Sequence, residues 1–301
     1  MNLSVKVGDL YLKTPIICAS GTFGLADELK DLVDYSAIGA VVSKTITLKP
    51  QAGNPPPRIY ELPAGVINSI GLENPGIDLF IKEKLKKFVS LPTKHIVSVG
   101  GFEDKEYIIC VEKLESFNKI DAFEINLSCP NIKLKKLISC DAKHTLKLLR
   151  SLRKLTKKPI IAKITAEVTD IVEIAKAIYD AGADAVSLVN TFFALAINIE
   201  TKKTYLGNVY GGYSGLAIKP IALYKVWKIA KNIDIPIIGG GGIKEAKDAI
   251  EFILAGAVAI SLGTINLTEP NKAVEILEGM KDYMKRKNIK DIKNLRGGLI
   301  V

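Results

Sequence analysis

Eight short, mostly apolar runs recur along the chain, separated by segments with the apolar spacing of amphipathic helices. Strands that are buried on both faces read in this way, as parallel strands do when helices cover them. The alternation therefore predicts an α/β protein, a (β/α)8 (TIM) barrel. The predicted strands are residues 15–19, 38–43, 96–99, 122–127, 159–164, 184–189, 235–239 and 257–262.

The intervening segments carry helix and turn signals. Apolar residues in 171–180 fall at i, i+3, i+4 and i+7, which places them on one helix face, and Gly182 follows as a stop signal. Before the first strand, Gly8 and Asp9 form a turn signal between two apolar runs, so we expect an N-terminal hairpin over the bottom of the barrel.

Length and loop spacing favour one domain over residues 1–301. Two connections, residues 45–76 and 190–215, are too long for simple βα loops, and we expect them to be active-site lids. No apolar run approaches the roughly 18 residues that span a bilayer, and no signal peptide precedes the first strand. We therefore expect a cytoplasmic protein that does not bind a membrane.

The formal charge of +10 raises the possibility of a nucleic-acid partner. The lysines are spread over many helical segments, which favours a solvated basic surface and no nucleic-acid binding. The four cysteines show no C-x-x-C spacing and there are only two histidines, so the sequence predicts no metal site in this chain.

Polar and glycine residues follow nearly every predicted strand. Barrel enzymes place their active sites at this C-terminal end of the strands. A near-complete ring of such residues therefore predicts an active site there. Its members are Ser20, Gly21, Lys44, Thr45, Ser98, Asn126, Lys163, Asn190, Thr191, residues 239–242, Gly263 and Thr264.

Glycines after the seventh and eighth strands predict a phosphate site. Gly241 and Gly242 follow one strand, and Gly263 and Thr264 follow the next. Barrels often bind phosphate at this point on backbone amides. A flexible turn is the alternative for one glycine run, but paired runs favour the phosphate site. The P-loop and Rossmann glycine patterns are missing.

Lys44 and Lys163 end two predicted strands, where burial disfavours a charged ammonium. An anionic ligand would stabilise them; a salt bridge at the barrel rim is the alternative.

Cys129 lies just beyond the fourth strand, within Asn126-Leu-Ser-Cys-Pro-Asn131. A thiol is partly ionised at neutral pH and can act as a base when it is correctly placed. A small buried apolar role is the alternative, which we expect for Cys18 and Cys110, while Cys140 stays open.

Amide side chains gather around the same predicted mouth. Asn68 lies in the long loop after the second strand, and Asn126, Asn131 and Asn190 come from later loops. Such a surplus of amides suits a planar, hydrogen-bonding heterocycle.

Taken in order, these segments resemble the class 1 dihydroorotate dehydrogenases over almost the whole chain. The matching segments are Ala19-Ser-Gly21, Lys44-Thr45, Gly53-Asn-Pro-Pro-Pro-Arg58, Asn68-Ser-Ile-Gly-Leu-Glu-Asn74, Asn126-Leu-Ser-Cys-Pro-Asn131, Asn190-Thr191, Gly211-Gly-Tyr-Ser-Gly215, Ile218-Lys-Pro220, residues 239–242 and Gly263-Thr264.

The resemblance implies an FMN-dependent enzyme that oxidises dihydroorotate to orotate in pyrimidine (UMP) biosynthesis, with Cys129 as the general base. It implies FMN contacts from Ser20, Lys44, Thr45, Asn126, Lys163, Val189, Gly215, Gly241, Gly242, Gly263 and Thr264. It implies substrate contacts from Lys44, Asn68, Ser69, Ile70, Gly71, Leu72, Asn126, Asn190 and Thr191, with Asn131 as a further candidate.

Within the family, residues 211–220 resemble the class 1B subgroup. This implies a partner subunit that carries FAD and an iron–sulfur cluster and passes electrons to NAD, in a heterotetramer built on a homodimer. Two departures are Ser98, where the family usually has an asparagine near the flavin, and residues 132–140, where relatives tend to carry glycines.

Two other functions remain open at this stage. A dihydropyrimidine dehydrogenase-like enzyme shares the FMN barrel and a similar cysteine motif, but its substrate lacks the carboxylate. A basic, non-catalytic barrel that binds RNA is the alternative from a different class.

Overall fold

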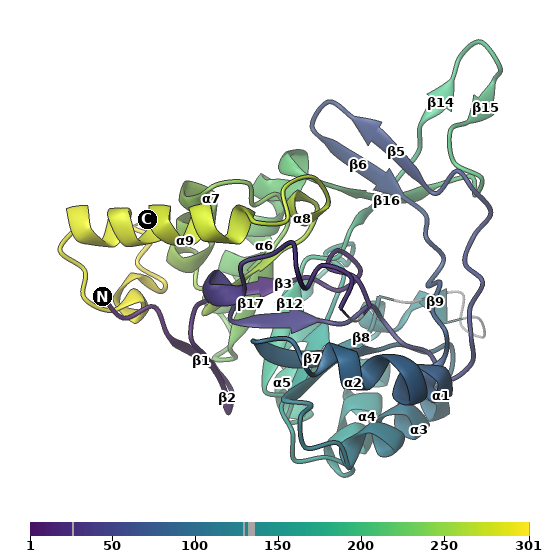
Figure 1. Cartoon of the computed structure of the whole chain (residues 1–301), viewed down its shortest axis with the longest axis horizontal. Coiled ribbons are helices and arrows are strands. Elements are labelled where there is room, and N and C mark those ends of the chain that lie inside the picture. The colour runs from purple at the N-terminus through teal and green to yellow at the C-terminus, as the bar shows by residue number, and fades with distance from the viewer. Residues whose placement is uncertain (26, 129, 132–135, 301) are drawn as a thin grey trace.

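A closed barrel of eight parallel strands forms the centre of the molecule (Figure 1). The computed structural model describes residues 1–25, 27–128, 130–131 and 136–300. Every predicted strand is present, and the predicted (β/α)8 barrel is confirmed. In barrel order, the strands are β3 (Ile16–Cys18), β4 (Ala40–Val42), β7 (Lys94–Val99), β8 (Ala122–Asn126), β11 (Ile160–Lys163), β12 (Ala185–Leu188), β17 (Ile237–Gly240) and β18 (Ala259–Leu262).

Helices surround the barrel and cover its strands. Helix α5 spans the ten residues that the apolar spacing predicted, and the Asp170 carboxylate caps it by accepting a hydrogen bond from the Val172 N–H. The α-helices are α1 (Ile77–Leu79), α2 (Leu85–Phe88), α3 (Asp104–Glu115), α4 (Ala142–Arg153), α5 (Ile171–Asp180), α6 (Lys219–Ala230), α7 (Ala246–Leu254), α8 (Ile265–Thr268) and α9 (Lys272–Arg286). A π-helical turn (Phe80–Lys84) joins α1 to α2, and the 3-10 turns are Tyr35–Ala37, Ile138–Cys140, Leu216–Ile218 and Ile292–Leu295.

The predicted N-terminal hairpin is confirmed as β1 (Val5–Val7) and β2 (Leu10–Leu12). Its turn needs a glycine, because Gly8 has a φ of +58°. Gly8 lies against Asp184, the residue before β12, so the hairpin sits at the N-terminal end of the barrel. Its inward side chains are buried, including Val7 and Leu12.

The two long connections, which the sequence predicts to be active-site lids, form one sheet together. The sheet has the order β13 (Phe192–Ala194), β16 (Gly211–Ser214), β6 (Gly65–Asn68) and β5 (Ile59–Leu62), and all its pairs are antiparallel. A small hairpin, β14 (Ile197–Asn198) and β15 (Lys203–Thr204), extends beyond it, at the upper right of Figure 1. A lid function for these segments stays a prediction.

The core is apolar and contains two of the cysteines. Cys18 and Cys110 are fully buried, as expected for small apolar side chains. Burial raises the pKa of the Cys110 thiol to about 12, so it stays protonated. No helix in the described ranges is both long and apolar enough to cross a membrane. The single domain predicted for residues 1–301 stays a prediction.

Candidate active site

Five neighbouring barrel strands carry a connected set of buried or half-buried polar side chains, most of them at or just beyond the C-terminal ends of the strands. The strands are adjacent in the order β3, β4, β7, β8 and β11, so side chains at their ends come together. The set consists of Ser20, Thr45, Ser98, Glu124, Asn126 and Lys163. We call it the polar half of the site.

Hydrogen bonds join this set from strand to strand. The Asn126 amide nitrogen donates to Thr45 Oγ1 at 3.2 Å, and Thr45 Oγ1 lies 3.0 Å from Ser98 Oγ. Ser98 Oγ donates to Glu124 Oε1 at 2.9 Å. Ser20 Oγ approaches Thr45 Oγ1 at 3.3 Å. Ser98 is fully buried, so its contacts are to protein groups and the flavin contact suggested by the family pattern stays untested.

The contacts fix the direction of each hydrogen bond. Because Ser98 gives its single proton to Glu124, it must accept from Thr45. Thr45 then has no proton left for Ser20, which must donate to it. The side-chain oxygen of Asn126, Oδ1, accepts from the Ser128 N–H at 3.2 Å. The side-chain nitrogen, Nδ2, is therefore the atom that donates to Thr45. The hydrogen bonds therefore form one chain, which runs from Thr45 through Ser98 to the Glu124 carboxylate.

Glu124 and Lys163 form the charged end of this set. Strand register pairs Glu124 with Ser98 on one side, and pairs Asn126 with Lys163 on the other. Lys163 Nζ lies 4.0 Å from Glu124 Oε1, and their side chains are 15% and 5% exposed. The salt bridge considered for Lys163 is therefore present, at the outer limit of an ion pair.

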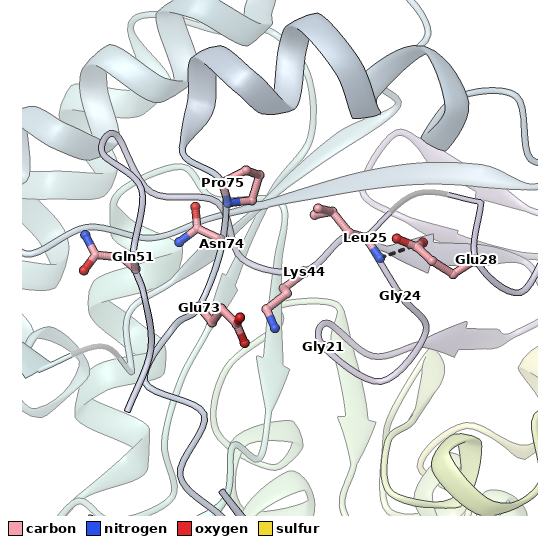
Figure 2. A pocket seen from close by; sticks show the side chains of 9 residues that line it. All are labelled: Gly21, Gly24, Leu25, Glu28, Lys44, Gln51, Glu73, Asn74 and Pro75. Carbon is pink, nitrogen blue, oxygen red and sulfur yellow. Dashed lines mark hydrogen bonds between the residues drawn. The ribbon is translucent and has the colours of Figure 1, made fainter. Parts of the chain in front are cut away.

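Lys44 has a different environment, two residues beyond β4. Within the described chain it has no carboxylate within ion-pairing distance. Burial lowers the pKa of its ammonium group, and the nearby Glu73 charge opposes that shift. Lys44, Glu73 and Gly21 line a pocket of about 520 Å³. Figure 2 shows the side chains of Lys44 and Glu73 close to each other at this pocket. An anion entering this pocket would compensate the partly buried ammonium.

The long loop after β4 is held in shape by its own polar groups. Arg58 spans it with hydrogen bonds to Asn54 O at 2.5 Å and Glu73 Oε2 at 2.5 Å. The buried side-chain oxygen of Asn74, Oδ1, accepts from the N–H groups of Thr47 and Gly76 at 3.2 and 2.9 Å. These contacts hold the residues on either side of the segment from Asn68 to Leu72.

Residues 68–72 take a conformation that depends on glycine. Gly71 and Leu72 both have a positive φ, and a Cβ at Gly71 would lie 2.5 Å from Asn54 N. Ile70 O accepts from Asn54 N at 3.1 Å, and Ser69 Oγ accepts from Asn54 Nδ2 at 2.8 Å. The turn around Gly71, which is predicted to contact the substrate, is therefore held in place by Asn54.

Strand β16 lies between Asn68 and the loop that carries Asn190 and Thr191. Asn68 Nδ2 donates to Gly212 O at 3.2 Å, and a Cβ at Gly212 would lie 1.9 Å from Thr191 Oγ1. Asn190 lies next to Thr191, whose N–H donates to Asn190 Oδ1 at 2.9 Å. Asn68 and Thr191, from two distant loops, thus flank the same glycine.

A second region of the site is made of backbone. Gly242 packs against Gly215, since a Cβ on Gly242 would lie 2.9 Å from Gly215 O. Gly241 lies against Val189, and Thr264 Oγ1 donates to Ser214 Oγ at 2.9 Å. We call Val189, Gly215, Gly241, Gly242, Gly263 and Thr264 the glycine half of the site.

Gly263 differs from its neighbours in this half. A Cβ there would meet no atom within 4 Å, whereas one at Gly242 would lie 2.7 Å from Lys219 Cβ. Gly263 therefore borders open space. Lys219 in turn holds the adjacent loop, because it pairs with buried Asp248 at 2.6 Å, and Asp248 accepts from the Lys244 N–H at 2.9 Å.

Cys129 and the side chain of Asn131 lie outside the described residues, so their predicted roles stay predictions. Their neighbours are fixed: Tyr107 donates its hydroxyl to Asn126 O at 2.9 Å. Residues 130–131 pair with 136–137 in a short antiparallel bridge. The Cys140 thiol is exposed and donates to Glu167 O at 3.7 Å.

Sequence reasoning missed Glu124, which connects the polar half. The available signal was a charged residue at the centre of a strand expected to be buried on both faces. The described residues contain no group of three or more histidines, cysteines and carboxylates able to hold a metal.

Comparison with known proteins identifies one family over nearly the whole chain. Residues 2–284 match the family model described as dihydroorotate dehydrogenase. The catalytic subunit of dihydroorotate dehydrogenase B (NAD(+)) from Caldicellulosiruptor bescii is 47% identical over 300 residues, covering 99% of both chains. The corresponding subunit from Bacteroides thetaiotaomicron is 42% identical over 301 residues, covering 100% of this chain and 99% of the relative.

A solved structure supports the fold alone. The Eimeria tenella enzyme described as DHODH, in complex with ferulenol, superposes with a TM-score of 0.83. It covers 99% of this chain and 88% of its own, at 23% sequence identity.

Proposed function

Because the chain belongs to the dihydroorotate dehydrogenase family, we propose that it is the FMN-binding catalytic subunit of a class 1B enzyme, which oxidises dihydroorotate to orotate in pyrimidine biosynthesis. The observation that carries the proposal is the pairing of a polar half and a glycine half at one end of the barrel. The first suits a flavin ring and its substrate, and the second suits a phosphate.

The residues fit FMN in two respects. The open space beside Gly263, next to the Thr264 hydroxyl, is a cradle that a side chain at 263 would fill. In the polar half, Lys163 provides a cation of the kind that stabilises negative charge on a reduced flavin. Ser20, Thr45 and Asn126 provide hydrogen-bonding groups next to it, with Lys44 at the pocket edge.

The substrate would lie between these residues and the loop above them. Lys44 would attract the substrate carboxylate, since its ammonium is partly buried and, within the described chain, no carboxylate lies at ion-pairing distance from it. Asn68 to Leu72, Asn126, Asn190 and Thr191 would hydrogen-bond the ring, with Asn131 as a further contact.

The reaction removes a proton and a hydride from neighbouring carbons. Cys129, as thiolate, would take the proton from C5 of dihydroorotate. Bound FMN would supply the acceptor for the hydride that leaves C6. Lys44 and the amide side chains would hold both carbons in position, so that the ring becomes orotate.

The names of the relatives describe catalytic subunits of NAD(+) enzymes, which implies a separate electron-transfer subunit for them. We propose that this chain likewise works with a subunit that carries FAD and an iron–sulfur cluster, in a heterotetramer built on a homodimer. Exposed apolar side chains support further protein contacts; they are Phe193, Leu195, Ile197, Ile199, Val209 and Tyr210. A cytoplasmic location stays a prediction.

One set of measurements tests the proposal. The purified chain should be yellow, contain FMN, and lose its flavin absorbance when anaerobic dihydroorotate is added. It should bind orotate more tightly than uracil and reduce NAD poorly by itself. Preference for uracil would favour the dihydropyrimidine dehydrogenase-like alternative, and a colourless protein that binds RNA in a salt-dependent way would contradict both.

A further inference from the structure

Glu124 is a buried carboxylate inside the polar half, and none of the proposed catalytic steps uses it. It is 4% exposed, in the middle of β8. Removing a carboxylate from water costs several kcal/mol unless charges and donors compensate it. Its position therefore needs a physical reason.

The surroundings of Glu124 are arranged for a negative charge. Ser98 donates to it at 2.9 Å, and Lys163 lies 4.0 Å away. Ser98 in turn accepts from Thr45, and Thr45 accepts from Ser20 and from the Asn126 amide. The same Thr45, Asn126 and Lys163 are proposed flavin contacts, so this charge lies one contact away from the flavin site.

We propose that Glu124 is a positioning residue that lowers the reduction potential of the bound flavin. The proposal rests on the proposed function, because it requires FMN in the polar half. A fixed negative charge disfavours the negative charge that reduction adds to the flavin ring, and it competes for the stabilising cation of Lys163. Nicotinamides are weak oxidants, so a flavin of low potential delivers electrons toward one more readily.

The test compares Glu124→Gln with a matched control, Asp121→Asn. Both changes replace a carboxylate with an amide near β8, and Asp121 also pairs with a lysine, Lys94 at 2.7 Å. Asp121 precedes β8, at the opposite end of the barrel, roughly 10 Å from Glu124 along the strand. The Asp121→Asn substitution therefore removes the same charge and leaves the residues of the polar half unchanged.

The midpoint potential of the bound flavin is measured in each purified, FMN-loaded variant. Glu124→Gln should shift it to a more positive value, and sulfite, which binds oxidised flavins more tightly when positive charge dominates nearby, should bind about tenfold more tightly. Asp121→Asn should leave both values unchanged. An unchanged potential in Glu124→Gln, or an equal shift in both variants, would overturn the proposal.

Ser98→Ala provides a second test if Glu124→Gln does not retain FMN. Loss of the Ser98 hydroxyl removes a donor that offsets the Glu124 charge, so the potential should shift to a more negative value. A positive shift or no shift contradicts the proposal. Wild-type protein without FMN would instead refute the proposed function, which separates the two failures.

Discussion

The polar half and the glycine half lie in neighbouring parts of the same barrel mouth, but side-chain contacts form the first and backbone contacts form the second. In the first, side chains on β8 and its neighbours donate to one another across strands. In the second, loops meet through glycines, where backbone replaces side chains. We therefore expect substitutions in the polar half to change the rate of the reaction and the properties of the flavin. Substitutions in the glycine half should change the affinity for the cofactor.

The largest effect is expected at Cys129, the proposed general base. Cys129→Ala should lower the rate of dihydroorotate oxidation by about 10²- to 10⁴-fold, because the general base is lost. FMN content should stay the same, and Cys129→Ser should be partly active at high pH. Stopped-flow flavin reduction measures the rate; near-normal turnover of the alanine variant at neutral pH would exclude Cys129 as the base.

A smaller effect is expected on stability within the polar half. Lys163→Met leaves buried Glu124 without its nearby cation and should lower the free energy of unfolding by about 2–3 kcal/mol. The double variant with Glu124→Gln should regain most of that loss. Urea unfolding of FMN-free protein measures both; simple additivity of the two single changes would show that the charges are not coupled.

In the glycine half, two similar substitutions should behave differently. Gly263→Ala meets no protein atom within 4 Å, so it should preserve the melting temperature while weakening FMN binding about tenfold. Gly242 has a φ of +79°, and an added Cβ would lie too close to Lys219. Gly242→Ala should therefore destabilise the protein itself by about 1–3 kcal/mol. Unchanged FMN affinity in Gly263→Ala would remove Gly263 from the phosphate site.

The smallest effect concerns pH. Burial holds the pKa of Lys44 below its ordinary value of 10.5, whereas a bound carboxylate would raise it. Orotate binding should therefore take up a proton in the window between the lowered pKa of the free protein and the higher pKa of the complex, and affinity should fall as pH rises through it. Titration calorimetry should show a change of a few-fold, less than about tenfold, that disappears in Lys44→Met. A flat profile in the wild type would argue against Lys44 as a substrate contact.

The barrel could be predicted from sequence because its strands are apolar and because apolar residues recur in its helices at the spacing of one buried helix face. The small sheet could not, since β16 reads Gly-Gly-Tyr-Ser and pairs with β6, far away in the chain. Likewise, the position of Glu124 within a strand was predictable, but its contacts with Ser98 and Lys163 depend on the register of three strands. The role of Cys129 as the base rests on the sequence alone and stays a prediction.

The shared sheet of the two long connections has a consequence for protein engineering. Asn68 and Gly212 are register partners, and Tyr60 stacks on Tyr205 at 3.9 Å between ring centres, so each connection is shaped by the other. A chimaera that exchanges only one of them with a relative would combine mismatched halves of a ladder. Transferring substrate preference between family members should therefore require both segments to be grafted as a unit.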